Sequence, residues 1–108
     1  MGLINMLFKT VPSYEGEVVF NKDIESVAEA IKKKMTSVMA FYMQLCKNVS
    51  SLGSIELGFV RDRDSSTADF FLMAIDGNTT KVTIRINGVA KNCKEVFDII
   101  VKYLNKKL

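Results

Sequence analysis

The sequence predicts an α+β fold, a two-layer sandwich in which two helices pack on one face of a mainly antiparallel, four-stranded sheet. Residues 54–87 read as three strands joined by turns, a helical apolar period lies on each side of that block, and a short alternating stretch precedes the first helix. The predicted order is therefore β-α-β-β-β-α, since two helices on one face bury every apolar stripe. The 108 residues suffice for one core, so we expect a single domain over 1–108, with 1–13 as an N-terminal arm or short extra element.

The first strand and the first helix follow from side-chain spacing. In residues 15–20, Val18 and Phe20 point to the same side of an extended chain, and Asn21 is a residue type that caps helices. Apolar residues then recur at every third or fourth position: Ile24, Val27, Ala28, Ile31, Met35, Val38, Met39, Tyr42 and Cys46. This spacing predicts one long helix of about six turns.

The second half of that predicted helix is apolar nearly all round, because Phe41, Met43 and Leu45 lie outside the stripe. A helix of this kind is buried on several sides. In a chain this small, we expect one of those sides to contact another subunit or a ligand.

Residues 54–87 predict an antiparallel meander. Apolar residues alternate with polar or small ones in 54–59 and again in 81–87, which gives each strand one buried and one wet side. The predicted strand 68–75 contains an unbroken apolar run over 70–75, which makes it apolar on both sides, as is typical of a central strand. Asp76-Gly77-Asn78 is a turn signal between two strands. The final helix is predicted to begin near Asn92, with a lysine-rich end.

The composition of the chain limits which catalytic and metal-binding sites it can form. The chain has no histidine, the commonest general base and metal ligand. It also has no Gly-rich phosphate loop or cysteine-pair metal motif, so we expect a non-enzymatic protein with no catalytic residue, no cofactor and no metal. Cys46 and Cys93 fall on helical stripes and are expected to be small buried hydrophobes, with a disulfide between them as the alternative. The sequence shows no signal peptide or membrane span, which favours the cytoplasm.

Apolar residues in excess of the core predict a docking surface. If both helices cover one face of the sheet, Phe71, Met73 and Ile75 are left on the other face, and Phe41 and Met43 pose the same problem on the long helix. We therefore expect a small interaction module, a homodimer or a complex with another protein, that joins through these five residues. The alternative is that residues 1–11 fold back and cover one of the two surfaces.

Two further hypotheses remain open. An apolar ligand would bind between the sheet and the long helix, in a pocket lined by Met35, Met39 and Tyr42. Nucleic acid would bind weakly, through phosphate contacts from Lys32, Lys33, Lys34, Lys102, Lys106 and Lys107. The net charge of +3 is well short of the basic stripe that marks dedicated nucleic-acid binders.

Overall fold

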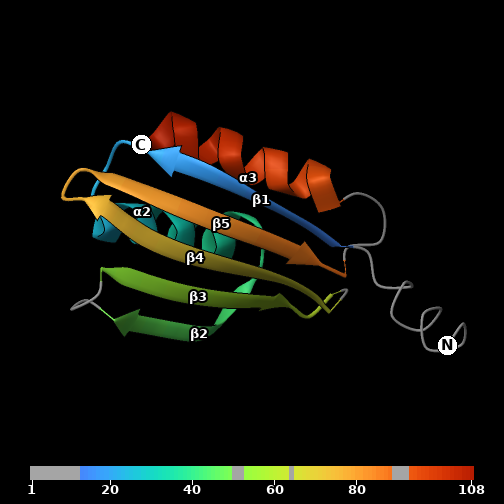
Figure 1. The fold of residues 1–108 in the computed structure, drawn as a ribbon. Helices are drawn as coiled ribbons and strands as arrows, with labels where there is room; N and C mark the ends of the chain where they lie inside the picture. Colours follow the sequence, from blue (N-terminus) through green and yellow to red (C-terminus); the bar gives the residue numbers. More distant parts are fainter. Residues whose placement is uncertain (1–12, 50–52, 64, 89–92) are drawn as a thin grey trace, which may run out of the picture.

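The computed structural model describes residues 13–49, 53–63, 65–88 and 93–108 of the chain. Figure 1 shows the elements in this order: β1 (Ser13–Phe20), α2 (Ile24–Lys33), the π-helical turn η1 (Lys34–Val38), β2 (Tyr42–Val49), β3 (Ser54–Arg61), β4 (Ser66–Asp76), β5 (Thr79–Asn87) and α3 (Cys93–Lys107). The N-terminal arm expected over 1–13 lies outside the described residues, apart from Ser13, which begins β1.

The five strands form one sheet in the order β1-β5-β4-β3-β2, and every neighbouring pair is antiparallel. β4 is therefore central, and β1 and β2 are the edge strands. In Figure 1, α2 lies behind the sheet and α3 runs alongside β1 at the top of the view; α2 packs against β3, β4 and β5, and α3 packs against β1 and β5. The predicted α+β class, with an antiparallel sheet and two helices, is confirmed. The predicted count of four strands is wrong, because the sheet has five. The predicted order β-α-β-β-β-α therefore lacks one strand, β2, directly after the first helix.

The additional strand comes from the second half of the predicted long helix. α2 begins after Asp23, whose carboxylate accepts hydrogen bonds from the backbone N–H of Ser26 (3.1 Å) and from its hydroxyl (2.6 Å). Asp23, rather than Asn21, is thus the N-cap. The helix passes into η1 and ends before Ala40, whose φ of 61° is a left-handed conformation that interrupts an α-helix.

Residues 42–49 then pair with β3, with Cys46 opposite Leu57 and Lys47 opposite Glu56. A short apolar run satisfies the period of a helix or of a strand, so its spacing alone decides neither. Aromatic residues such as Tyr42 favour extended backbone. Pairing with β3, the next strand along the chain, also gives these backbone groups hydrogen-bond partners within the sheet, and this contact selects the strand.

The core lies between the sheet and the two helices. Each strand contributes alternate residues, so that Phe70 and Leu72 of β4 face the helices while Phe71 and Met73 face away. The largest fully buried side chains are Phe59, Phe70, Ile31, Met35, Leu57, Leu72, Ile84, Ile86, Ile100, Leu104, Val27 and Val82. Burial of each large apolar side chain stabilises the fold by about 1.5–3 kcal/mol.

β1 approaches α3 closely at Gly16. A Cβ added to Gly16 would lie 2.6 Å from Cζ of Phe97, far inside ordinary contact distance. The Phe97 ring also packs edge-on against Tyr14, with the two ring centroids 5.0 Å apart. The absence of a side chain at Gly16 therefore makes room for the ring that joins α3 to the sheet.

We expect Gly16→Ala to lower the free energy of unfolding by about 1–3 kcal/mol, because the ring and the strand must move apart. Urea unfolding followed by circular dichroism measures this. Gly77→Ala is the matched control, since its added Cβ would meet nothing within 4 Å, and its effect should stay within about 0.5 kcal/mol. Equal stability of Gly16→Ala and the parent chain would contradict the close approach.

Candidate interaction surface

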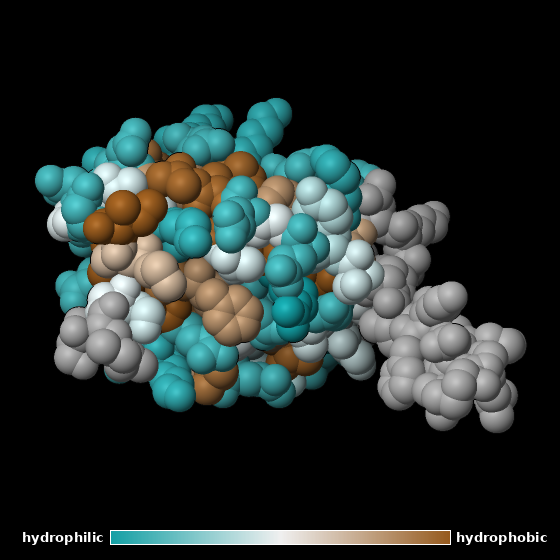
Figure 2. All heavy atoms as spheres, in the orientation of Figure 1, coloured by the Kyte–Doolittle hydropathy of each residue, from teal (hydrophilic) through white to brown (hydrophobic). Residues whose placement is uncertain are grey.

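The face of the sheet opposite the helices is left without cover by the described elements (Figure 1). Strand register places one side chain from each strand in a row across its middle: Glu17, Thr83, Phe71, Glu56 and Lys47. We call this surface the open face. Figure 2 views it directly and shows apolar residues gathered among hydrophilic ones.

Three apolar side chains follow one another along β4 on the open face. Phe71, Met73 and Ile75 are 39%, 53% and 56% exposed, and we call them the β4 patch. Val19 of β1 is also exposed and lies in the same cross-strand row as Met73, with Lys81 between them. A row of large exposed apolar side chains in the centre of a sheet is typical of a contact surface.

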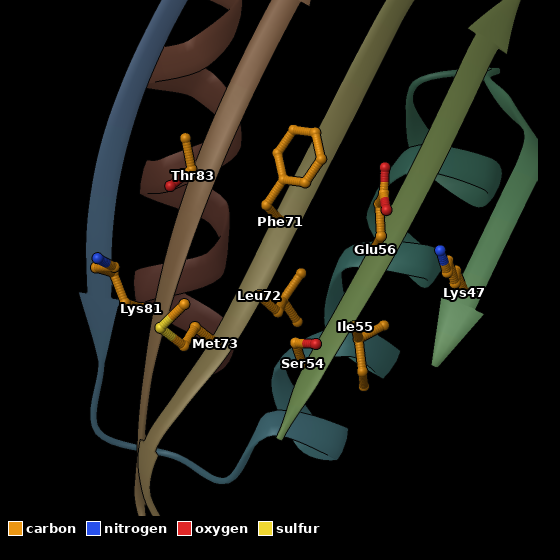
Figure 3. Close-up of a pocket in the computed structure, with 9 residues that line it drawn as sticks. All are labelled: Lys47, Ser54, Ile55, Glu56, Phe71, Leu72, Met73, Lys81 and Thr83. Atoms are coloured by element: carbon orange, nitrogen blue, oxygen red, sulfur yellow. The ribbon is translucent and has the colours of Figure 1, made fainter. Parts of the chain in front are cut away.

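A shallow hollow of about 410 Å³ lies over this part of the sheet. In Figure 3, Phe71 and Met73 of β4 form its floor, Lys81 of β5 and Lys47 of β2 stand at opposite sides, and Glu56 of β3 lies between. The hollow therefore combines an apolar floor with a charged rim, as protein contacts commonly do.

Charged side chains beside the β4 patch neutralise one another. The guanidinium of Arg85 lies 2.8 Å from the Glu15 carboxylate, and the ammonium of Lys81 lies 3.9 Å from that of Glu17. These pairs are exposed to solvent, so each contributes less than about 1 kcal/mol to stability. Their main effect is to leave this side of the open face with little net charge.

Asp69 lies on β4 two residues before Phe71, half-buried between Gly58 of β3 and Arg85 of β5. Burial raises the pKa of its carboxyl above the usual 3.8, while Arg85 lowers that pKa and Glu56 raises it further. The folded chain therefore binds the Asp69 proton more tightly than the unfolded chain does. The stability of the fold falls as pH rises through the folded pKa of Asp69.

We expect Asp69→Asn to stabilise the fold at neutral pH, where it removes a partly desolvated charge. At a pH below the pKa of Asp69 in the unfolded chain, the carboxyl is neutral in both states, so the gain should vanish. Urea unfolding of both proteins at the two pH values measures the difference. A variant that is less stable than the parent at neutral pH would show that attraction to Arg85 outweighs the cost of burial.

Strand β2 also exposes the apolar side chains of Tyr42, Met43 and Leu45. Met43 pairs with the inward Phe59 and therefore lies on the helix side of the sheet, whereas Tyr42 and Leu45 lie on the open face. Leu45 lies on the open face above Gly58, with its Cβ 3.2 Å from the place that a Cβ on Gly58 would take. The hydroxyl of Tyr42 donates a 2.8 Å hydrogen bond to the carboxylate of Asp62, which raises the pKa of Tyr42. Leu45 and Tyr42 thus extend the apolar surface to one edge of the sheet.

Of the five residues predicted to bind a partner, four are exposed to solvent and one is buried. Met43 and the β4 patch are exposed, as such a role requires. Phe41 is only 2% exposed, and its ring packs in the core with the Arg61 guanidinium 4.8 Å from its centroid. The placement of Phe41 on an outward helix face is wrong, because the chain leaves the helix before Ala40 and turns this ring inward.

The three residues of the predicted ligand pocket lie in different surroundings. Met35 is fully buried in η1, Met39 packs at the margin of the core, and Tyr42 is exposed on β2. The helical stripe that would have aligned them ends at Val38. The geometry on which the pocket hypothesis depended is therefore absent.

The six lysines predicted to contact phosphates differ in their exposure to solvent. Lys33, Lys102, Lys106 and Lys107 are exposed, and Lys32 lies 3.4 Å from the Glu29 carboxylate. Lys34 is only 7% exposed, with its ammonium 4.3 Å from the centroid of the Tyr103 ring on α3. The inclusion of Lys34 among the phosphate contacts is wrong, because α3 packs beside the end of α2 and a cation–π contact with Tyr103 holds this side chain.

The two cysteines also differ from each other. Cys93 is buried at the start of α3, as predicted, whereas Cys46 is exposed on β2. No disulfide joins them. The expectation that Cys46 is a buried hydrophobe is wrong for the same reason as that for Phe41: the helical stripe on which it was placed does not form.

Sequence reasoning did not identify the exposed Val19. It counted Leu45 among the excess apolar residues but placed it on a helix, and its position above Gly58 in the sheet follows only from the strand pairing. The alternation in β1 put Val19 opposite Val18 and Phe20, which could have marked it as outward-facing.

The residues that the structure describes hold no group of three Asp, Glu or Cys side chains that could bind a metal ion together. No helix in this part of the chain is long and apolar enough to cross a membrane. In comparisons with known proteins, no family model and no curated protein matches the chain.

Proposed function

We propose that this chain is a non-enzymatic interaction module that forms a homodimer through the open face of its sheet. One observation carries the proposal: Phe71, Met73 and Ile75 occupy successive outward positions on the central strand and remain exposed to solvent. The methionine adds a flexible, polarizable side chain that adapts to a partner's surface.

The size of the open face supports this role. Five strands of about eight residues give a face of about 24 Å by 27 Å, or about 650 Å² in projection. A stable dimer buries about 800 Å² of accessible surface on each partner. Since projecting side chains raise the accessible area above the projected one, the whole open face meets this requirement, whereas the β4 patch alone does not.

The arrangement of side chains on the open face suits two copies packed face to face. The β4 patch is central, and the pairs Glu15–Arg85 and Glu17–Lys81 lie beside it towards the β1 edge. Charged residues at a rim stay solvated, while the apolar centre is dehydrated. Two sheets that pack in this way lie about 10 Å apart.

We expect the parent chain to show twice the mass of one chain by light scattering at micromolar concentration, and Phe71→Lys to weaken the dimer about tenfold or more. Phe71 lies opposite Glu56 and Thr83 on the exposed side of β4, so a lysine there should be tolerated by the fold.

Ile99→Lys is the matched control, because Ile99 is similarly exposed, at 46%, but lies on α3. It should leave the mass unchanged. A parent chain that remains monomeric at its highest soluble concentration would refute the proposal. So would a Phe71→Lys variant that dimerises as well as the parent.

A further inference from the structure

The outer edge of β2 is a second surface through which the molecule can contact a partner. β2 is the last strand of the sheet, bonded to β3 on one side and, within the described residues, to no strand on the other. Residues 42–48 are all exposed. An edge strand of this length presents a row of backbone N–H and C=O groups that another strand can pair with.

The two edges of the sheet differ in how well they are protected. β1 carries Glu15 and Glu17, both paired with charged residues of β5, and α3 packs against it. β2 carries a single charged residue, Lys47, among three exposed apolar ones. Charges and bulges keep edge strands from associating. β2 has a bulge between Met43 and Leu45 but only one charged residue, so it is the less protected of the two edges.

We infer that two copies of this chain pair at β2, antiparallel and strand to strand, to give one continuous ten-stranded sheet. A reversed copy of an edge offers the same spacing of donors and acceptors, so the second copy needs no surface other than β2 itself. A two-fold axis perpendicular to the sheet keeps both helix layers on one side and both open faces on the other.

Symmetry limits the register of this pair. In an antiparallel ladder, neighbouring residue pairs alternate between hydrogen-bonded and non-hydrogen-bonded. Under a two-fold axis, the pairs on either side of the axis must be alike. One residue of β2 must therefore lie directly opposite its own copy, because an axis between two pairs would break the alternation.

Cys46 is the residue that best occupies the axis. Centring on Lys47 would place two lysines opposite each other, which destabilises a strand pair. Centring on Leu45 would put the β-bulge between Met43 and Leu45 in the middle of the seam. Centring on Cys46 keeps the bulge at the margins and sets each Lys47 opposite the second copy's Leu45.

The edge contact and the open-face contact are compatible. A seam of one strand is about 27 Å long and buries less surface than a whole sheet face, so we expect it to be the weaker contact. Where both form, two ten-stranded sheets pack face to face as a tetramer with three perpendicular two-fold axes. Only this tetramer rests on the proposed function; the edge pair stands without it.

Disulfide trapping tests the edge pair. Cys46 opposite Cys46 has a Cα–Cα distance of about 4.5–5.5 Å, within the range of a disulfide. Under mild oxidation, we expect a Cys46-linked dimer to form about tenfold faster than a dimer of the double variant Cys46→Ser, Ile99→Cys, which reports random collision. Cys93 is buried and should not contribute. Equal rates for the two proteins would overturn the inference.

A charge exchange at Leu45 tests the register. Leu45→Glu places a carboxylate opposite each Lys47 of the second copy and should speed trapping about two- to tenfold, whereas Leu45→Lys should slow it by a similar factor. Leu45 is exposed, so both variants should fold, and circular dichroism checks this. If both substitutions slow trapping, like charges meet at Leu45 and the register centred on Cys46 is wrong.

Phe71→Lys separates the two contacts. The edge inference predicts that trapping at Cys46 persists in this variant, because Phe71 is two strands away from β2. If trapping is lost together with the open-face dimer, the Cys46 contact depends on the open face and the edge pair is refuted. If trapping persists while Phe71→Lys leaves the mass unchanged, the edge pair stands and the proposed function fails.

Discussion

Burial of one face of the sheet beneath both helices is the constraint from which the other features follow. Val82, Ile84 and Ile86 on β5, with Phe70 and Leu72 on β4, are fully or almost fully covered by α2 and α3. Because side chains alternate along a strand, each inward residue commits its neighbours to the opposite side. The two helices cover β1, β5, β4 and β3 on one face, and the other face is left to water or to a partner.

The open face shows the consequences of that one-sided cover. On β5 its residues are polar or charged, as expected of a wet surface, and they pair with glutamates of β1. On β4 the outward residues are apolar, with the partly buried Asp69 beside them. Burial raises the pKa of the Asp69 carboxyl, whereas the apolar residues that follow it on β4 remain exposed to solvent. Docking of a partner would dehydrate these residues.

The two edge strands, β1 and β2, are the places at which another strand can add to the sheet. Contact between Gly16 and Phe97 fastens β1 to α3. No described helix packs over β2 in the same way, and its side chains are exposed on both sides of the strand. The molecule therefore exposes two different surfaces within the described residues, apolar side chains on a face and the backbone of β2 along an edge.

The sequence by itself determined the features that depend on local period and composition: the α+β class, the meander of β3, β4 and β5, the final helix, and the placement of Phe71, Met73 and Ile75 together on one side of their strand. Each follows from alternation or helical spacing within a few residues. Tertiary structure alone decided the secondary structure of residues 42–49. Their spacing fits a helix and a strand equally, and pairing with β3 selects the strand. Tertiary structure also decided that Phe41 is buried in the core and that Lys34 contacts the ring of Tyr103. Tyr103 lies far along the chain from Lys34, and the strand that pairs with residues 42–49 lies outside their own segment, so the spacing within that segment does not carry this information.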